Sequence, residues 1–314
     1  MKEYKIDQLS NSIKGSKNKS SRPKIKGFGY QVLGFGSGGE KAIYTLNYLV
    51  VAGGGGSGAS NSSGGAGQKL GGGGAGGYRT SGFGPAPLQG SAISCVEGGT
   101  YAVVVGAGGP TSTSNPVGCG NASSFNAPSP VGITSAGGGH GASHKTQMQA
   151  GGSGGGCAPG SAGGGAAGNT PPTCPPQGND GGDGGGEDPN PGGGGGGGAT
   201  AAGGDQPAGC QRGGAGAPNA ISGSAVTYAT GGTASPVPEG GDGAANTGEG
   251  GGSKSPGSAP CGLGGNGGPG IVIVRLPSDA TLAVNPGTNT TGVAPDCSSY
   301  KIATFTVSGC LTIS

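Results

Sequence analysis

The two histidines, His140 and His144, lie four residues apart. On an α-helix that spacing would place both rings on one face, where Cys119 or Cys157 could complete a metal site. The glycines around His140 oppose a helix, because glycine costs about 1 kcal/mol per helical position relative to alanine. We therefore expect both histidines in exposed loops and predict no bound metal.

Four carboxylates lie close together in another glycine-rich stretch, at Asp180, Asp183, Glu187 and Asp188. Carboxylate and carbonyl oxygens are the ligands that Ca²⁺ prefers. Their spacing matches neither an EF-hand nor a calcium-binding β-helix repeat. A solvated turn is the favoured interpretation, and a calcium site is the alternative.

Catalytic arrangements are missing from the sequence pattern. Residues Gly250–Ser255 look like a phosphate-binding loop, but Ser253 occupies the position that requires glycine, and no helical pattern follows. No Ser-His-Asp or Cys-His spacing indicates an activated nucleophile. A glycan-cleaving carboxylate pair needs a rigid groove, and with 4% aromatic residues the chain has little to line one. We predict that the protein is not an enzyme and uses no cofactor.

Composition limits the fold. Of 314 residues, 85 are Gly and 24 are Pro, and the formal net charge is only +2. Glycine runs such as Gly192–Gly198 break the period of three that a collagen helix requires. No apolar stretch approaches the roughly 20 residues that span a bilayer, so we expect no membrane insertion.

The N-terminus is basic but lacks the apolar stretch of a secretory signal, so we expect assembly in a cytoplasm. Eight cysteines leave disulfides open. Reducing conditions favour free, buried thiols instead. Cys297 and Cys310 flank one C-terminal segment and are the first pair to check.

Three regions follow from the pattern. Residues 1–40 form a basic arm that ends in alternating glycine and aromatic residues, residues 41–276 form a glycine-rich module, and residues 277–314 form a hairpin-like segment. β-Branched or alternating residues predict short strands in a few places. These places are Ala42–Ala52, Thr100–Gly106, Ala225–Ala229, Ile271–Val274 and Ile302–Val307.

The glycine runs need another source of order, because they bury little side chain and each ordered residue costs about 1–2 kcal/mol of backbone entropy. Extended polyproline-II-like strands make no internal hydrogen bonds, so their N–H and C=O groups need lateral partners. Only glycine lets such strands approach closely. We predict a mostly β and irregular fold, in which a short β-strand frame encloses a polyglycine-II-type bundle and almost no α-helix occurs. Disorder of the glycine runs is the alternative.

The order of these segments resembles a glycine-rich module common in structural proteins of tailed bacteriophages and in some environmental bacterial proteins. The resemblance rests on successive motifs at Tyr48–Gly56, Gly73–Thr80, Tyr101–Gly109, Asn121–Phe125, Val226–Gly232 and Gly264–Arg275. In its glycine-rich composition, the chain is similar to the tip adhesins of T-even-like long tail fibres, which have a polyglycine-II core. In one respect it departs: Lys301–Ser314 resembles a hairpin that usually precedes the module. This segment either pairs back onto the frame or joins another subunit.

The resemblance implies a virion protein, expected in a tail fibre or similar appendage that contacts the host. A capsid decoration or head-fibre protein is one alternative, and an extracellular glycine-rich matrix or ice-binding protein is another. Residues 1–40 would dock on other virion proteins through Phe28, Tyr30 and Phe35. Nucleic acid is the disfavoured partner of this arm, which lacks a stacked aromatic platform.

A host glycan or outer-membrane protein is the expected partner of the module. Binding contacts should lie where larger side chains interrupt the glycines, because aromatic and arginine side chains dominate interface energies. We predict contacts at Arg79, Phe83, His140, His144, Lys145, Gln147 and Met148. Tyr78 and Phe125 are expected to cap the ends of the bundle instead.

Overall fold

The computed structural model describes residues 40–59, 70–112, 118–126, 129, 131–143, 147–159, 164–186, 192–206, 211–234, 241–253 and 264–314. The chain divides into two units, Met1–Lys41 and Ala42–Ser314. The strands and the glycine-rich segments between them belong to Ala42–Ser314. The anchoring candidates Phe28, Tyr30 and Phe35 lie outside the described residues, as do His144 and Lys145.

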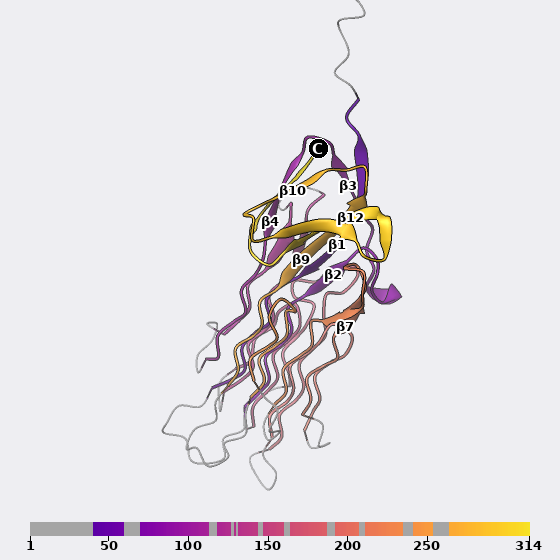
Figure 1. The fold of residues 1–314 in the computed structure, drawn as a ribbon. Coiled ribbons are helices and arrows are strands. Elements are labelled where there is room, and N and C mark those ends of the chain that lie inside the picture. Colours follow the sequence, from indigo (N-terminus) through magenta and orange to yellow (C-terminus); the bar gives the residue numbers. More distant parts are fainter. Residues whose placement is uncertain are drawn as a thin grey trace, which may run out of the picture. The chain divides into compact units, whose positions relative to one another are not determined.

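Short antiparallel strands gather into a frame (Figure 1). One sheet has the order β11-β12-β9-β1-β2, with β3 also paired to β1, and a second has the order β10-β13-β4-β5-β6. A separate hairpin joins β7 to β8. The strands are β1 (Ile43–Val51), β2 (Tyr78–Thr80), β3 (Ile93–Val96), β4 (Thr100–Val104), β5 (Ser123–Phe125), β6 (Ile133–Ser135), β7 (Ala217–Asn219), β8 (Val226–Tyr228), β9 (Ile271–Pro277), β10 (Leu282–Asn285), β11 (Thr290–Ala294), β12 (Cys297–Phe305) and β13 (Gly309–Ile313).

The frame has an apolar core on each face of β1, because successive side chains of a strand point to opposite sides. Leu46 and Tyr48 belong to the first core, which also holds Phe125, Phe305 and Leu311. The opposite face of the same sheet packs against the β7–β8 hairpin through a second core. Its buried members include Leu49, Val51, Tyr78, Ile221, Tyr228, Ile271 and Ile273. Tyr78 and Phe125 are thus core residues of the frame.

The glycine runs form extended legs that leave the frame and return to it (Figure 1). Leg 70–77 shows the bonding rule, since its successive N–H groups donate in turn to three different neighbours and the pattern repeats every third residue. The N···O distances are 2.8–3.1 Å. The acceptors lie in legs 136–142, 194–197 and 248–251.

Three further legs donate to the carbonyls of leg 70–77, at residues 52–58, 153–156 and 232. This leg therefore has six neighbours and bonds to all of them sideways. A period of three matches the three residues per turn of a polyproline-II strand. The bonding is that of polyglycine II.

Close contact between the legs explains the glycines. A Cβ atom built on Gly73 would lie 2.1 Å from the carbonyl oxygen of Gly55, and one on Gly196 would lie 1.9 Å from that of Gly73. Both distances fall inside van der Waals contact, so alanine would push the legs apart. Backbone fills most of the interior of the bundle.

These features confirm the predicted fold class. In the described part of the chain the helical element is a single 3₁₀ turn, Ala86–Leu88, and it lacks the length and apolar character of a membrane span. The C-terminal segment pairs back onto the frame, with β12 beside β9 and β13 beside β4. Cys297 and Cys310 therefore lie in different sheets, and both are free thiols.

Candidate functional site

The predicted binding residues are not brought together. Arg79 is on β2, opposite Val50 of β1, and Phe83 follows that strand closely. Gln147 and Met148 begin a leg that runs back to the frame from the far end of the bundle. The legs extend away from the frame (Figure 1). We define the distal end of the bundle by two hydrogen-bonded groups, Ala59 with Ser112 and Ser143, and Leu70 with Ser253.

The prediction that His140 lies in an exposed loop is wrong, because its side chain is fully buried in a leg near the distal end. Its Nε2 lies 3.1 Å from the carbonyl oxygen of Ser112. Its Nδ1 has no hydrogen-bond partner among the described residues. A Cβ on Gly118 would lie 2.0 Å from the imidazole ring, so the missing side chain there leaves room for it. Burial lowers the pKa of His140 and favours a neutral ring.

The acidic residues act as caps on backbone groups. Asp180 Oδ1 accepts the N–H of Gly168 at 2.8 Å, and Asp183 Oδ1 accepts that of Gly165 at 2.7 Å. Two carboxylates three residues apart thus serve two N–H groups three residues apart on the next leg. They replace the carbonyls that a further leg would supply. Glu187 and Asp188 lie outside the described residues.

A buried arginine at the frame is a feature that the sequence did not single out. Arg275 of β9 is 3% exposed, and its Nη1 lies 2.9 Å and 3.0 Å from the two carboxylate oxygens of Asp296. Its guanidinium lies 4.7 Å from the ring centroid of Phe83 and 4.9 Å from that of Tyr300. The charge is therefore compensated by an ion pair and two aromatic faces.

Phe83 contributes to this cluster from a φ of 63°, which residues other than glycine seldom adopt. Phe83 is 39% exposed and Tyr300 is 36% exposed. The Arg275 cluster, which comprises Phe83, Arg275, Asp296 and Tyr300, joins β9, β12 and the segment after β2. It offers a stacked aromatic surface of the composition that dominates protein interfaces. Of the predicted contact residues, Phe83 is the one in this cluster.

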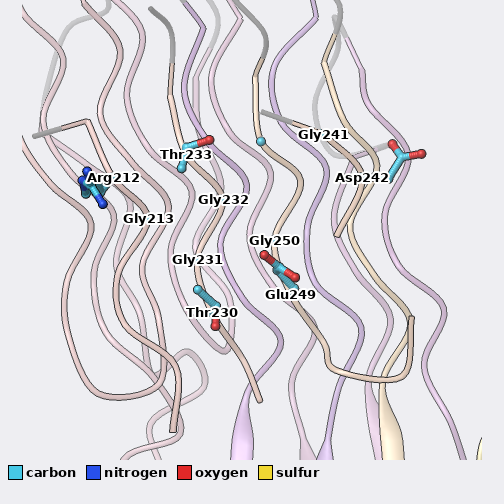
Figure 2. Close-up of a pocket in the computed structure, with 11 residues that line it drawn as sticks. Arg212, Gly213, Thr230, Gly231, Gly232, Thr233, Gly241, Asp242, Glu249 and Gly250 are labelled. Atoms are coloured by element: carbon cyan, nitrogen blue, oxygen red, sulfur yellow. The ribbon is translucent and has the colours of Figure 1, made fainter. Parts of the chain in front are cut away.

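A groove of about 280 Å³ runs along the side of the bundle (Figure 2). Leg 230–233 lies in the middle, with Arg212 on one side and Asp242 on the other. Most of the lining is glycine backbone from four legs, together with Thr230, Thr233 and Glu249. The carboxylates near the groove already accept backbone N–H groups, Asp242 from Asn266 and Glu249 from Ala244. This surface is suited to hydrogen bonding through backbone groups.

Comparison with known proteins gives one match. No curated protein and no solved structure matches the chain. A family model described as a glycine-rich domain matches residues 30–277, which is well over half of the sequence. That range includes the frame strands from β1 to β9 and the described legs between them. The chain belongs to this family of glycine-rich domains.

Proposed function

We propose that the chain is a structural virion protein of a tailed bacteriophage, placed in a tail fibre or similar appendage that contacts the host surface. The observation that carries the proposal is the polarity of Ala42–Ser314. Ala42 exchanges backbone and side-chain hydrogen bonds with Glu97, and Ile313 bonds to Gly98 and Gly99. Both ends of this unit therefore meet at one turn of the frame, and the legs extend to the distal end.

Such polarity suits a part that is held at one end and presents the other. The bundle supplies stiffness, because each interior leg is bonded to neighbours on all sides. Residues 1–40 would hold the protein on its virion partners. The distal end, to which Gln147 and Met148 belong, would then face a host glycan or outer-membrane protein.

The site chemistry supports a role without catalysis. The buried imidazole of His140 faces a backbone carbonyl, and the described carboxylates Asp180, Asp183, Asp242 and Glu249 accept backbone N–H groups. These groups hold the bundle together. This arrangement fits a binding or structural role.

Antibody labelling of intact particles tests the location, and competition with the purified chain tests host contact. We expect label on the tail appendage and a dose-dependent loss of phage adsorption. The double variant Gln147→Ala/Met148→Ala should compete more weakly, whereas Thr45→Ala, an exposed change on the frame, should compete like the native chain. Label on the capsid with unchanged adsorption would favour a decoration or head-fibre role. Absence from particles would favour a matrix or ice-binding protein.

A further inference from the structure

The groove in Figure 2 follows from the bonding rule of the legs. In leg 229–234, Gly231 and Ala234 donate to Gly214 and Gln211 of one neighbour, and Gly232 donates to Gly73 of another. The third direction belongs to Thr230 and Thr233. Their N–H groups have no acceptor in the described part of the chain. Both residues line the groove.

The adjoining leg 249–253 has the complementary opening. The N–H groups of Gly250 and Gly252 donate to Thr230 and Gly241, and the carbonyls of Gly251 and Gly252 accept from Gly73 and Gly265. The carbonyl of Gly250 accepts from no described residue. Gly250 also lines the groove. One space is thus bordered by two donors and one acceptor that have no partner among the described residues, on two legs that are bonded to each other.

We propose that this groove binds a single extended, glycine-rich strand of another polypeptide as an additional leg of the bundle. Two carbonyls three residues apart on that strand would accept from Thr230 and Thr233, and one of its N–H groups would donate to Gly250. A polyproline-II strand repeats every three residues at a rise of about 3.1 Å per residue. Thr230 and Thr233 have that same repeat, so one strand satisfies both.

The occupant must be glycine-rich for two reasons. Neighbouring legs approach so closely that a Cβ on Gly232 or Gly250 would lie 2.1 Å or 2.0 Å from a backbone oxygen. A strand that lies equally close to its neighbours in the groove likewise has no room for Cβ atoms. Proline also lacks the N–H that Gly250 needs as a donor. A proline-rich strand of identical shape is therefore excluded.

Some other edges of the bundle are capped by side chains. Asp180 and Asp183 cap Gly168 and Gly165, and the Asn266 side chain accepts the N–H of Thr111. No described side chain caps Thr230 or Thr233, although Asp242 and Glu249 are close by in the groove. The opening therefore differs from edges that the sequence has closed. This inference does not depend on the proposed function.

The test is a titration of the full, ¹⁵N-labelled chain with a peptide of the sequence Gly192–Ala199 flanked by lysines for solubility. We expect saturable amide shifts at Thr230 and Thr233, and exchange of these amides slowed by about tenfold or more in the complex. An oligoproline peptide of equal length is the matched control and should leave both amides unchanged.

Thr233→Pro removes one donor without breaking any hydrogen bond between described residues, and the φ near −65° that proline requires suits an extended leg. It should weaken binding of the glycine peptide by about tenfold or more. Ala202→Pro removes an exposed N–H outside the groove and should leave the affinity for the peptide unchanged. If Thr233→Pro lowers the unfolding midpoint, Thr230→Pro serves as the second variant.

Three results would overturn the proposal. They are the absence of saturable shifts at millimolar peptide, equal binding of the oligoproline peptide, and native affinity in folded Thr233→Pro. Self-association of the native chain that Thr233→Pro abolishes would support the proposal and would identify a second copy as the source of the strand.

Discussion

The frame and the bundle are two solids built on opposite principles. In the frame, buried side chains such as Phe125, Phe305 and Leu311 fill the space between sheets, and the strands bond to one another within each sheet. In the bundle, backbone fills the space, and every interior leg bonds to neighbours on all sides. Removing atoms should therefore damage the frame, whereas adding them should damage the bundle.

The largest effect is expected from a deletion in the frame core. Phe305→Ala empties a fully buried position, and losses of about 3–5 kcal/mol are typical for buried Phe→Ala changes. Chemical denaturation of the full chain measures the change. A loss below about 1 kcal/mol would mean that the side-chain core contributes little to the frame.

The converse experiment adds one methyl group to the bundle. Gly73→Ala places a Cβ against the backbone oxygen of Gly55, and overpacking typically costs about 1–3 kcal/mol. Gly292→Ala is the matched control, because a Cβ there meets nothing within 4 Å. The same denaturation assay should separate the two, and equal stability of both variants would show that the legs are loosely packed.

A smaller effect is expected at the Arg275 cluster, which belongs to the frame. Asp296→Asn leaves the buried guanidinium without its anion, and hydrogen bonds to charged groups contribute about 1.5–3 kcal/mol. The loss should lie towards the lower end of that range, since Asp296 is 38% exposed and solvent screens the pair. Asp279→Asn, on the same frame, is the control. Unchanged stability of Asp296→Asn would mean that the two aromatic rings alone compensate the buried charge of Arg275.

The smallest effect is a pH dependence in the bundle. Burial holds the pKa of His140 below its ordinary value of 6.5, so the unfolded chain takes up the proton first as the pH falls. The stability linked to neutral His140 is complete above about pH 6.5 and declines as the pH drops towards the lowered folded pKa. Thermal melts between pH 8 and 5.5 measure this change. His140→Gln should remove the acid-side decline, and an identical decline in that variant would assign it to other groups.

Much of the frame could be predicted from the sequence, because a β-branched run or an alternating pattern within one segment indicates a strand. The segments that became β1, β4, β8, β9 and β12 each show one of these local patterns. The polyglycine-II bonding also followed from a general need, since extended glycine backbones must find lateral partners. Short strands such as β7, which contains Pro218, give no such signal.

Features that depend on which legs are neighbours could not be predicted. His140 is buried against Ser112 and Gly118, and the residues next to it in the sequence do not predict those contacts. Arg275 was noted only as part of a motif, because its partners Phe83, Asp296 and Tyr300 come from three separate segments. The groove could not be predicted for the same reason, since the gap between legs depends on which legs are neighbours.

Hydrogen exchange, resolved by residue, tests most directly whether the bundle is a solid held by its backbone. The amides of leg 71–77 all donate to other legs and should exchange only on global unfolding, at rates matching the core amides of β1 and β9. The amides of Thr230 and Thr233 should exchange much faster in the same molecule. Fast, unprotected exchange throughout leg 71–77 alongside protected β1 would contradict the account.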